Sequence, residues 1–124
     1  MTFEAIPTTT SKMQLPQYIL VTLALALPLA SAFGGKATFY EPNSLGSCGQ
    51  QLTADSGTVA LSRSHDGNCG RTVPVTSNGR SVTAKVADAC SGCGTDGIDL
   101  TKSKFLELGG NVGTASLSVS WDFV

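Results

Sequence analysis

The chain has 124 residues, a formal net charge of −1, 41% apolar residues and 14% charged residues. This length accommodates one domain, and the ordinary apolar fraction excludes disorder throughout. Because the basic residues are not in excess, there is no electrostatic reason to expect nucleic acid or an anionic membrane as a partner, and we expect neither.

The only long apolar run lies early in the chain, at residues 18–29. It is too short to cross a hydrocarbon core, which needs about 20 residues. Ala30-Ser31-Ala32 follows it, and small residues in this arrangement are typical of a secretory cleavage site. We therefore predict a signal peptide or leader over residues 1–32, a mature domain over residues 33–124 and an extracellular location. A buried helix or a membrane anchor is the alternative.

Beyond residue 33, apolar and polar residues alternate with a period of two, which is typical of half-buried strands. In chain order, we expect strands at residues 36–40, 58–62, 72–76, 82–87 and 116–123. Asn78-Gly79 separates the third strand from the fourth. This pair supplies the two positive φ angles of a type I′ turn, so it predicts a hairpin.

One short helix is expected from residue 101 onward. Thr101 is its expected N-cap, Phe105 and Leu108 share one face, and Gly109-Gly110 ends it. Six or so short strands, one short helix and frequent glycine turns predict a small closed barrel or a sandwich. The pattern does not choose between these two folds.

Four cysteines, Cys48, Cys69, Cys90 and Cys93, fall in the predicted mature domain. In an oxidising compartment they indicate two disulfides, for which three connectivities exist. We expect Cys48–Cys69 and Cys90–Cys93, and the first would close a loop worth roughly 3 kcal/mol. A zinc site is the alternative, although such sites usually show two CxxC pairs and this chain has one. We expect no metal and no cofactor.

Two further features have a catalytic and a structural interpretation. His65, the single histidine, lies in a loop-like segment. We interpret it as an exposed turn residue rather than a general base, because the pattern places no nucleophile near it. The CxxC segment at residues 90–93 is expected to be a structural disulfide rather than a redox pair, because the strand–helix context of thioredoxin-like sites is absent.

Three carboxylates lie near the ends of predicted strands. Asp88 has the same parity as the apolar positions of residues 82–86, so it is expected to end an inward-facing run as a hydrogen-bond anchor or a groove floor. Asp99 lies between two apolar residues, as in a half-exposed strand, and Glu41 follows the first strand. Such carboxylates suit glycosidic acid/base chemistry or hydrogen bonds to sugar hydroxyls.

An ordered series of short segments then resembles a known family. The segments are GKATFY at 35–40, GSCG at 46–49, VALS at 59–62, NCGR at 68–71, VADACSGC at 86–93, GIDLT at 97–101 and VSWDF at 119–123. Together they resemble the expansin catalytic-like domain, and within it the fungal single-domain expansin-like proteins called loosenins. These proteins belong to the wider barwin and rare lipoprotein A superfamily.

The resemblance implies an all-β fold, a six-stranded double-psi β-barrel with one or two short helices and an open groove across one face. It also implies a secreted protein that binds cell-wall polysaccharide of the cellulose or chitin class and loosens it without net hydrolysis. We expect a monomer.

The site residues are carried over position by position. Asp99 matches the acid that expansins need for wall loosening, Asp88 matches their second groove acid, and Thr38 and Tyr40 match groove-lining positions of the first strand. Cys90 stands where expansins carry an aromatic residue, and their C-terminal domain has no counterpart in this sequence. Both departures predict weaker binding, because aromatic faces supply much of the contact area with sugar rings.

Two alternatives come from related proteins. In family-45 endoglucanases an acid near the position of Glu41 is the general base, so Glu41 and Asp99 are the candidate pair for a glycoside hydrolase or lytic transglycosylase. We favour a solvated Glu41, because exposed acids at strand ends are common. Similar small barrels include inhibitors of papain-like cysteine proteases, and the predicted loop at residues 62–68 is suited to entering a protease cleft.

Overall fold

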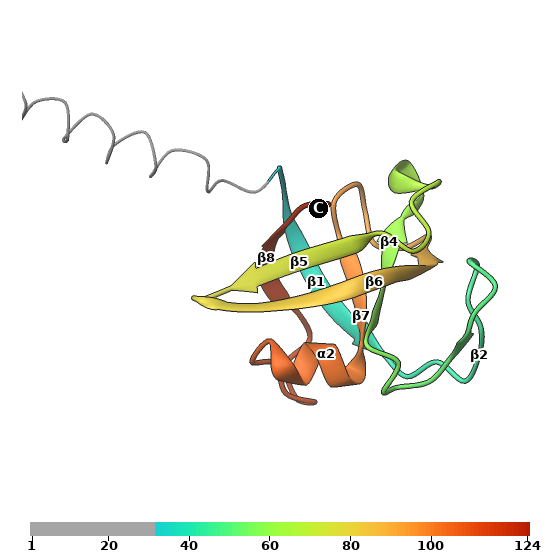
Figure 1. The fold of residues 1–124 in the computed structure, drawn as a ribbon. Coiled ribbons are helices and arrows are strands. Elements are labelled where there is room, and N and C mark those ends of the chain that lie inside the picture. The colour runs from blue at the N-terminus through green and yellow to red at the C-terminus, as the bar shows by residue number, and fades with distance from the viewer. Residues whose placement is uncertain (1–31) are drawn as a thin grey trace, which may run out of the picture. The chain divides into compact units, whose positions relative to one another are not determined.

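A computed structural model describes residues 32–124, so the predicted leader lies outside the described residues except for Ala32. The elements are β1 (Phe33–Tyr40), β2 (Ser44–Leu45), β3 (Gln51–Leu52), β4 (Thr58–Ser62), the 3-10 helix η1 (Arg63–His65), β5 (Thr72–Ser77), β6 (Arg80–Cys90), β7 (Ile98–Thr101), α2 (Lys102–Glu107) and β8 (Leu117–Trp121). Six strands close into a barrel in the order β1-β7-β4-β6-β5-β8 (Figure 1). The prediction of a six-stranded barrel is confirmed.

The barrel combines parallel and antiparallel neighbours. β1 pairs with β7 and β4 with β6 in parallel, whereas β7 with β4, β6 with β5, β5 with β8 and β8 with β1 pair in antiparallel fashion. Each of the six strands therefore has a partner on both sides, and closure removes the free edges at which sheets aggregate.

Alternating apolar side chains fill the barrel. The core contains Val59, Leu61, Val73, Val75, Val82, Ala84, Val86, Ile98, Leu100, Val119 and Trp121, among others. The helix α2 covers one end of the barrel (Figure 1), and its Phe105 is fully buried. The 3.6-residue period of the helix places Leu108 on the same side, where it is also buried.

The first strand begins three residues earlier than predicted, because it includes Gly34 and Gly35. Both glycines pair with β8, and glycine weakens the strand pattern of a sequence. Gly35 has a specific role: a Cβ there would lie 2.5 Å from the carbonyl oxygen of Asp96. The close approach of the β6–β7 loop to β1 therefore requires glycine at position 35.

The hairpin between β5 and β6 is as predicted. Asn78 has φ 49° and Gly79 has φ 82°, so both central residues have the positive φ of a type I′ turn. The helix prediction is correct in position but wrong about the cap. Thr101 stands at the N-cap position, yet its hydroxyl accepts from the Thr58 amide (3.1 Å) and donates to the Thr58 carbonyl (3.2 Å), joining β7 to β4.

The disulfides are Cys48–Cys69 and Cys90–Cys93, the pairing that we expected. All four cysteines of the chain are used in these two bonds. Within residues 32–124, no helix has the length and apolar character needed to cross a membrane.

Candidate functional site

The register of β4 against β6 decides where Asp88 points. Val59 pairs with Val86, but the next residue, Ala60, pairs with Asp88, so Ala87 is an extra residue in β6. Such a bulge shifts the alternation and turns the following side chains to the other face of the sheet. The prediction that Asp88 ends the inward-facing run is therefore wrong. Val86 belongs to the core, whereas Asp88 lies on the outer face of the barrel.

Asp88 and Asp99 lie on one face of the barrel, on either side of the same residue. Ala60 in β4 pairs with Asp88 in β6 and with Asp99 in β7, and Asp99 pairs in turn with Thr38 in β1. Paired residues of adjacent strands project from the same face, so these four residues form one line across four strands. We call Thr38, Asp99, Ala60 and Asp88 the transverse row. The sequence pattern gave no sign of Ala60, whose methyl group is buried between the two acids.

Hydrogen bonds join β1 to both acids of the transverse row. The Thr38 hydroxyl donates to Oδ1 of Asp99 over 3.0 Å, and the Tyr40 hydroxyl donates to Oδ2 of Asp88 over 3.1 Å. Oδ1 of Asp88 accepts two backbone amides, from Ser47 and Ala89, each over 2.9 Å. The four predicted groove residues are therefore brought together, in two hydrogen-bonded pairs.

The surroundings shift the acidity of two of these groups. Burial raises the pKa of the Asp99 carboxyl, and the negative charge of Asp88 raises it further, while the Thr38 hydrogen bond acts in the opposite direction. Burial also raises the pKa of the Tyr40 phenol, and Asp88 adds to this effect through its charge and its hydrogen bond. Asp88 and Asp99 are thus close enough for their charges to repel.

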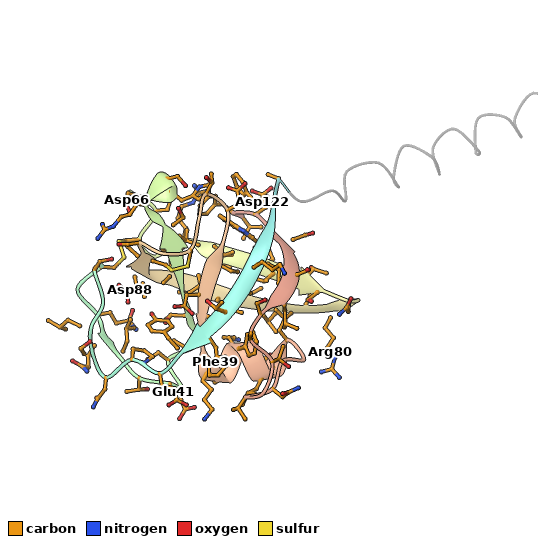
Figure 2. All side chains as sticks on the ribbon, turned by 180° about the vertical axis from the view of Figure 1, so that it is seen from behind. Phe39, Glu41, Asp66, Arg80, Asp88 and Asp122 are labelled. Atoms are coloured by element: carbon orange, nitrogen blue, oxygen red, sulfur yellow. A yellow bond between two sulfur atoms is a disulfide. The ribbon has the colours of Figure 1, made fainter. Side chains whose placement is uncertain are left out.

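Glu41 is placed differently from the other candidates. It follows β1, and its Oε2 lies 2.7 Å from Nζ of Lys102, the first residue of α2. Figure 2 shows Glu41 toward one end of the barrel, apart from Asp88. No hydrogen bond links Glu41 to the transverse row among the described residues, so Glu41 is paired with the Lys102 cation rather than with the second acid of a hydrolytic pair.

Comparison with known proteins connects this barrel to a family. The chain is 30% identical over 108 residues to a papain inhibitor from Streptomyces mobaraensis. The aligned region covers 79% of this chain and 76% of the inhibitor. The solved structure of the Streptomyces papain inhibitor superimposes with a TM-score of 0.67 at 29% identity, over 76% of this chain and 96% of that one. An expansin from Clavibacter michiganensis superimposes with a TM-score of 0.66 at 30% identity. The chain belongs to the expansin-like double-psi β-barrel family.

This chain spans only part of the length of some of the proteins that it matches. The match covers 74% of this chain and 50% of the Clavibacter expansin, of which a mutant was also solved in complex with cellohexaose. A homologue of the allergen Asp f 7 from Arthroderma benhamiae is 33% identical over 82 residues, which is 28% of its length. No family model matches the chain.

The histidine of this expansin-like barrel is not the exposed turn residue that we predicted. The His65 side chain is 13% exposed, and its Nε2 lies 3.0 Å from Oδ1 of Asp96. Its ring packs edge-on against Phe33 and Trp121, with centroids 4.7 and 5.0 Å away. The sequence-based prediction failed because these partners come from both ends of the domain.

A small pocket of about 30 Å³ adjoins the transverse row at Asp88. Its wall includes the Cys48–Cys69 disulfide, Ser47 and Asn68, and its apolar floor includes Leu61. A water molecule needs roughly 10–15 Å³ by this measure. The pocket therefore has room for one or two water molecules or for a small substituent of a ligand.

Proposed function

We propose that this expansin-like barrel acts outside the cell, where it binds cell-wall polysaccharide of the cellulose or chitin class along the transverse row and loosens it without net hydrolysis. The observation that carries the proposal is the gathering of Thr38, Tyr40, Asp88 and Asp99 on one outer face. Carboxylates and hydroxyls in such a line are suited to hydrogen bonds with sugar hydroxyls. Two disulfides and the cellohexaose complex of the similar expansin support the extracellular, polysaccharide-binding role.

The arrangement of the acids favours binding over hydrolysis. An inverting hydrolase needs two carboxyl groups on opposite sides of the scissile bond, one of them free to activate water. Asp88 already accepts three hydrogen bonds, and Glu41 is paired with Lys102. Asp99 therefore has no matched partner among these acids, which supports a role in binding.

The proposal is tested by co-sedimentation with insoluble cellulose and chitin. We expect the wild type to bind at least one polymer, and Asp99→Ala to bind at least several-fold more weakly. Asp55→Asn is the control, because Asp55 is an exposed acid outside the transverse row. If the wild type stays in the supernatant with both polymers, the proposal is wrong. Release of soluble sugar that is lost in both Glu41→Gln and Asp99→Asn would instead support a hydrolase.

A second candidate function is inhibition of a papain-like cysteine protease. The similarity to the Streptomyces papain inhibitor favours it, because that match covers nearly all of the inhibitor's structure. The exposed segment at residues 63–70 is suited to binding a protease cleft, since contacts with the rest of the barrel hold it at several points. The Ser64 hydroxyl donates to the Thr95 carbonyl (2.8 Å), His65 contacts Asp96, and Cys69 is fixed by its disulfide. A loop whose conformation is already fixed before binding loses little conformational entropy when it binds.

Titration of papain with the purified protein tests this second function. If it holds, papain activity falls as the protein approaches micromolar concentration, and Asp66→Ala in the exposed loop weakens the effect more than Asp99→Ala does. Unchanged papain activity at micromolar protein removes this candidate. A stronger effect of Asp99→Ala would place the inhibitory surface at the transverse row.

A further inference from the structure

We infer that Asp88 is a positioning residue rather than a sugar ligand: it fixes the Tyr40 hydroxyl so that the phenol oxygen faces the polysaccharide as a hydrogen-bond acceptor. This inference rests on the proposed function. Of the two roles expected for Asp88, it favours the hydrogen-bond anchor over a groove acid that contacts the sugar directly.

The first step compares how many hydrogen bonds each of the two carboxylates, Asp88 and Asp99, already accepts. An ionised carboxylate offers about four acceptor sites. Asp88 uses three of them, for the Ser47 and Ala89 amides and the Tyr40 hydroxyl. Among the described residues, the Asp99 side chain accepts one hydrogen bond, from the Thr38 hydroxyl. The capacity to accept hydrogen bonds from a ligand therefore lies mostly on Asp99.

The second step concerns the direction of the hydroxyl protons. A phenol or an alcohol has one proton to donate. Tyr40 donates its proton to Asp88, and Thr38 donates its proton to Asp99 at 3.0 Å in preference to the Ile98 carbonyl at 3.4 Å. What remains toward a ligand is the acceptor capacity of both hydroxyl oxygens and of Asp99. The face therefore recognises donors such as sugar hydroxyls and amide N–H groups, and it disfavours the carboxylates of a polyuronate.

The third step is the mechanical role of Asp88. By accepting the Ser47 amide, it ties the segment at residues 46–48 to β6, beside the Cys48 amide that donates to the Ala87 carbonyl over 3.3 Å. Asp88 thus connects β1, β6 and the chain leading to β3. A group that holds three segments at once is suited to positioning.

The decisive variant is Asp88→Asn, which keeps the shape of the side chain. The amide oxygen can still accept the Ser47 and Ala89 amides, but the NH₂ group now donates to Tyr40 and reverses the phenol's hydrogen-bond direction. We expect cellulose or chitin binding to fall about three- to tenfold, as for one hydrogen bond. In a Tyr40→Phe background, Asp88→Asn should cause little further loss. Equal losses in both backgrounds would overturn the inference, because Asp88 would then contact the sugar itself.

A second readout needs no polysaccharide. In the full chain with Tyr18→Phe, Tyr40 is the only tyrosine, and its ionisation is followed by ultraviolet absorbance. Because Asp88 helps to raise the pKa of this phenol, the Tyr40 phenol should ionise at lower pH in Asp88→Asn than in the matched Asp55→Asn variant. An unchanged titration would overturn the positioning role. If the titration shifts but the wild type binds neither polymer, the proposed function fails and the Asp88–Tyr40 link stands.

Polymer preference gives the third readout. We expect the wild type to bind neutral cellulose or chitin in preference to polygalacturonate at equal ionic strength. Preferential binding of polygalacturonate would overturn the acceptor-only description of this face.

Discussion

The two acids of the transverse row differ in what surrounds them. Asp88 is held by three donors, whereas Asp99 is partly buried beside another negative charge. The three hydrogen bonds fix the position of the Asp88 side chain, whereas burial and the neighbouring charge raise the pKa of Asp99. The row therefore combines an acid that organises the site with an acid whose ionisation costs stability.

This difference predicts how folding stability depends on pH. The pKa of Asp99 is raised in the folded protein, so the folded state holds this proton more tightly than the unfolded state. Its contribution to the free energy of unfolding therefore falls as pH rises from the ordinary aspartate value through the raised folded value. Asp99→Asn should remove this decline, so that the variant gains stability relative to the wild type above that window and not below it. Urea unfolding at several pH values measures the difference, and a constant difference across pH would contradict the prediction.

At this scale, the sequence predicted which candidate residues lie together but not the direction in which each side chain points. Thr38, Tyr40, Asp88 and Asp99 were all identified from their motifs, and the structure places them together. The predicted orientation of Asp88 was wrong, because one extra residue in β6 reverses the alternation of inward-facing and outward-facing side chains. A bulge depends on the register of a neighbouring strand, which a single strand's sequence does not contain.

At the scale of elements, local signals succeeded where the backbone has special requirements. Asn78-Gly79 predicted the β5–β6 hairpin because few residue pairs adopt two positive φ angles. The two-residue strands β2 and β3 were missed, since two residues show no periodicity. The prediction that the Thr101 side chain caps the helix was also wrong, because the Thr101 hydroxyl bonds to the backbone of Thr58 in β4 instead.

The hairpin turn gives a prediction with a matched control. Gly79 has φ 82° and open space around it, so Gly79→Ala introduces backbone strain without a steric clash. We expect a loss of about 1 kcal/mol in the free energy of unfolding. Gly92 also has open space, but its φ is outside the left-handed range, so Gly92→Ala should be neutral or slightly stabilising. Equal effects in chemical denaturation would show that the φ requirement at Gly79 is not the cause.

At the scale of the whole molecule, the disulfides act on different lengths of chain. Cys48–Cys69 spans 21 residues of sequence and Cys90–Cys93 spans 3. Loop-closure entropy predicts a loss of roughly 3 kcal/mol when Cys48 and Cys69 are both changed to serine. The matching double change at Cys90 and Cys93 should cost less, about 2 kcal/mol. Thermal unfolding of the two variants compares them, and a larger loss for the second pair would contradict the entropic explanation.

The last strand also bears on how the protein is made. β8 pairs with both β1 and β5, and Phe33 in β1 faces Trp121 in β8, 88 positions later. A nascent chain that has emerged only as far as residue 116 can form at most an open sheet, with β1 and β5 each lacking one neighbour. The barrel can therefore close only after synthesis of nearly the entire domain. A chain truncated before Leu117 would expose the unpaired edges of β1 and β5 instead of forming a closed barrel.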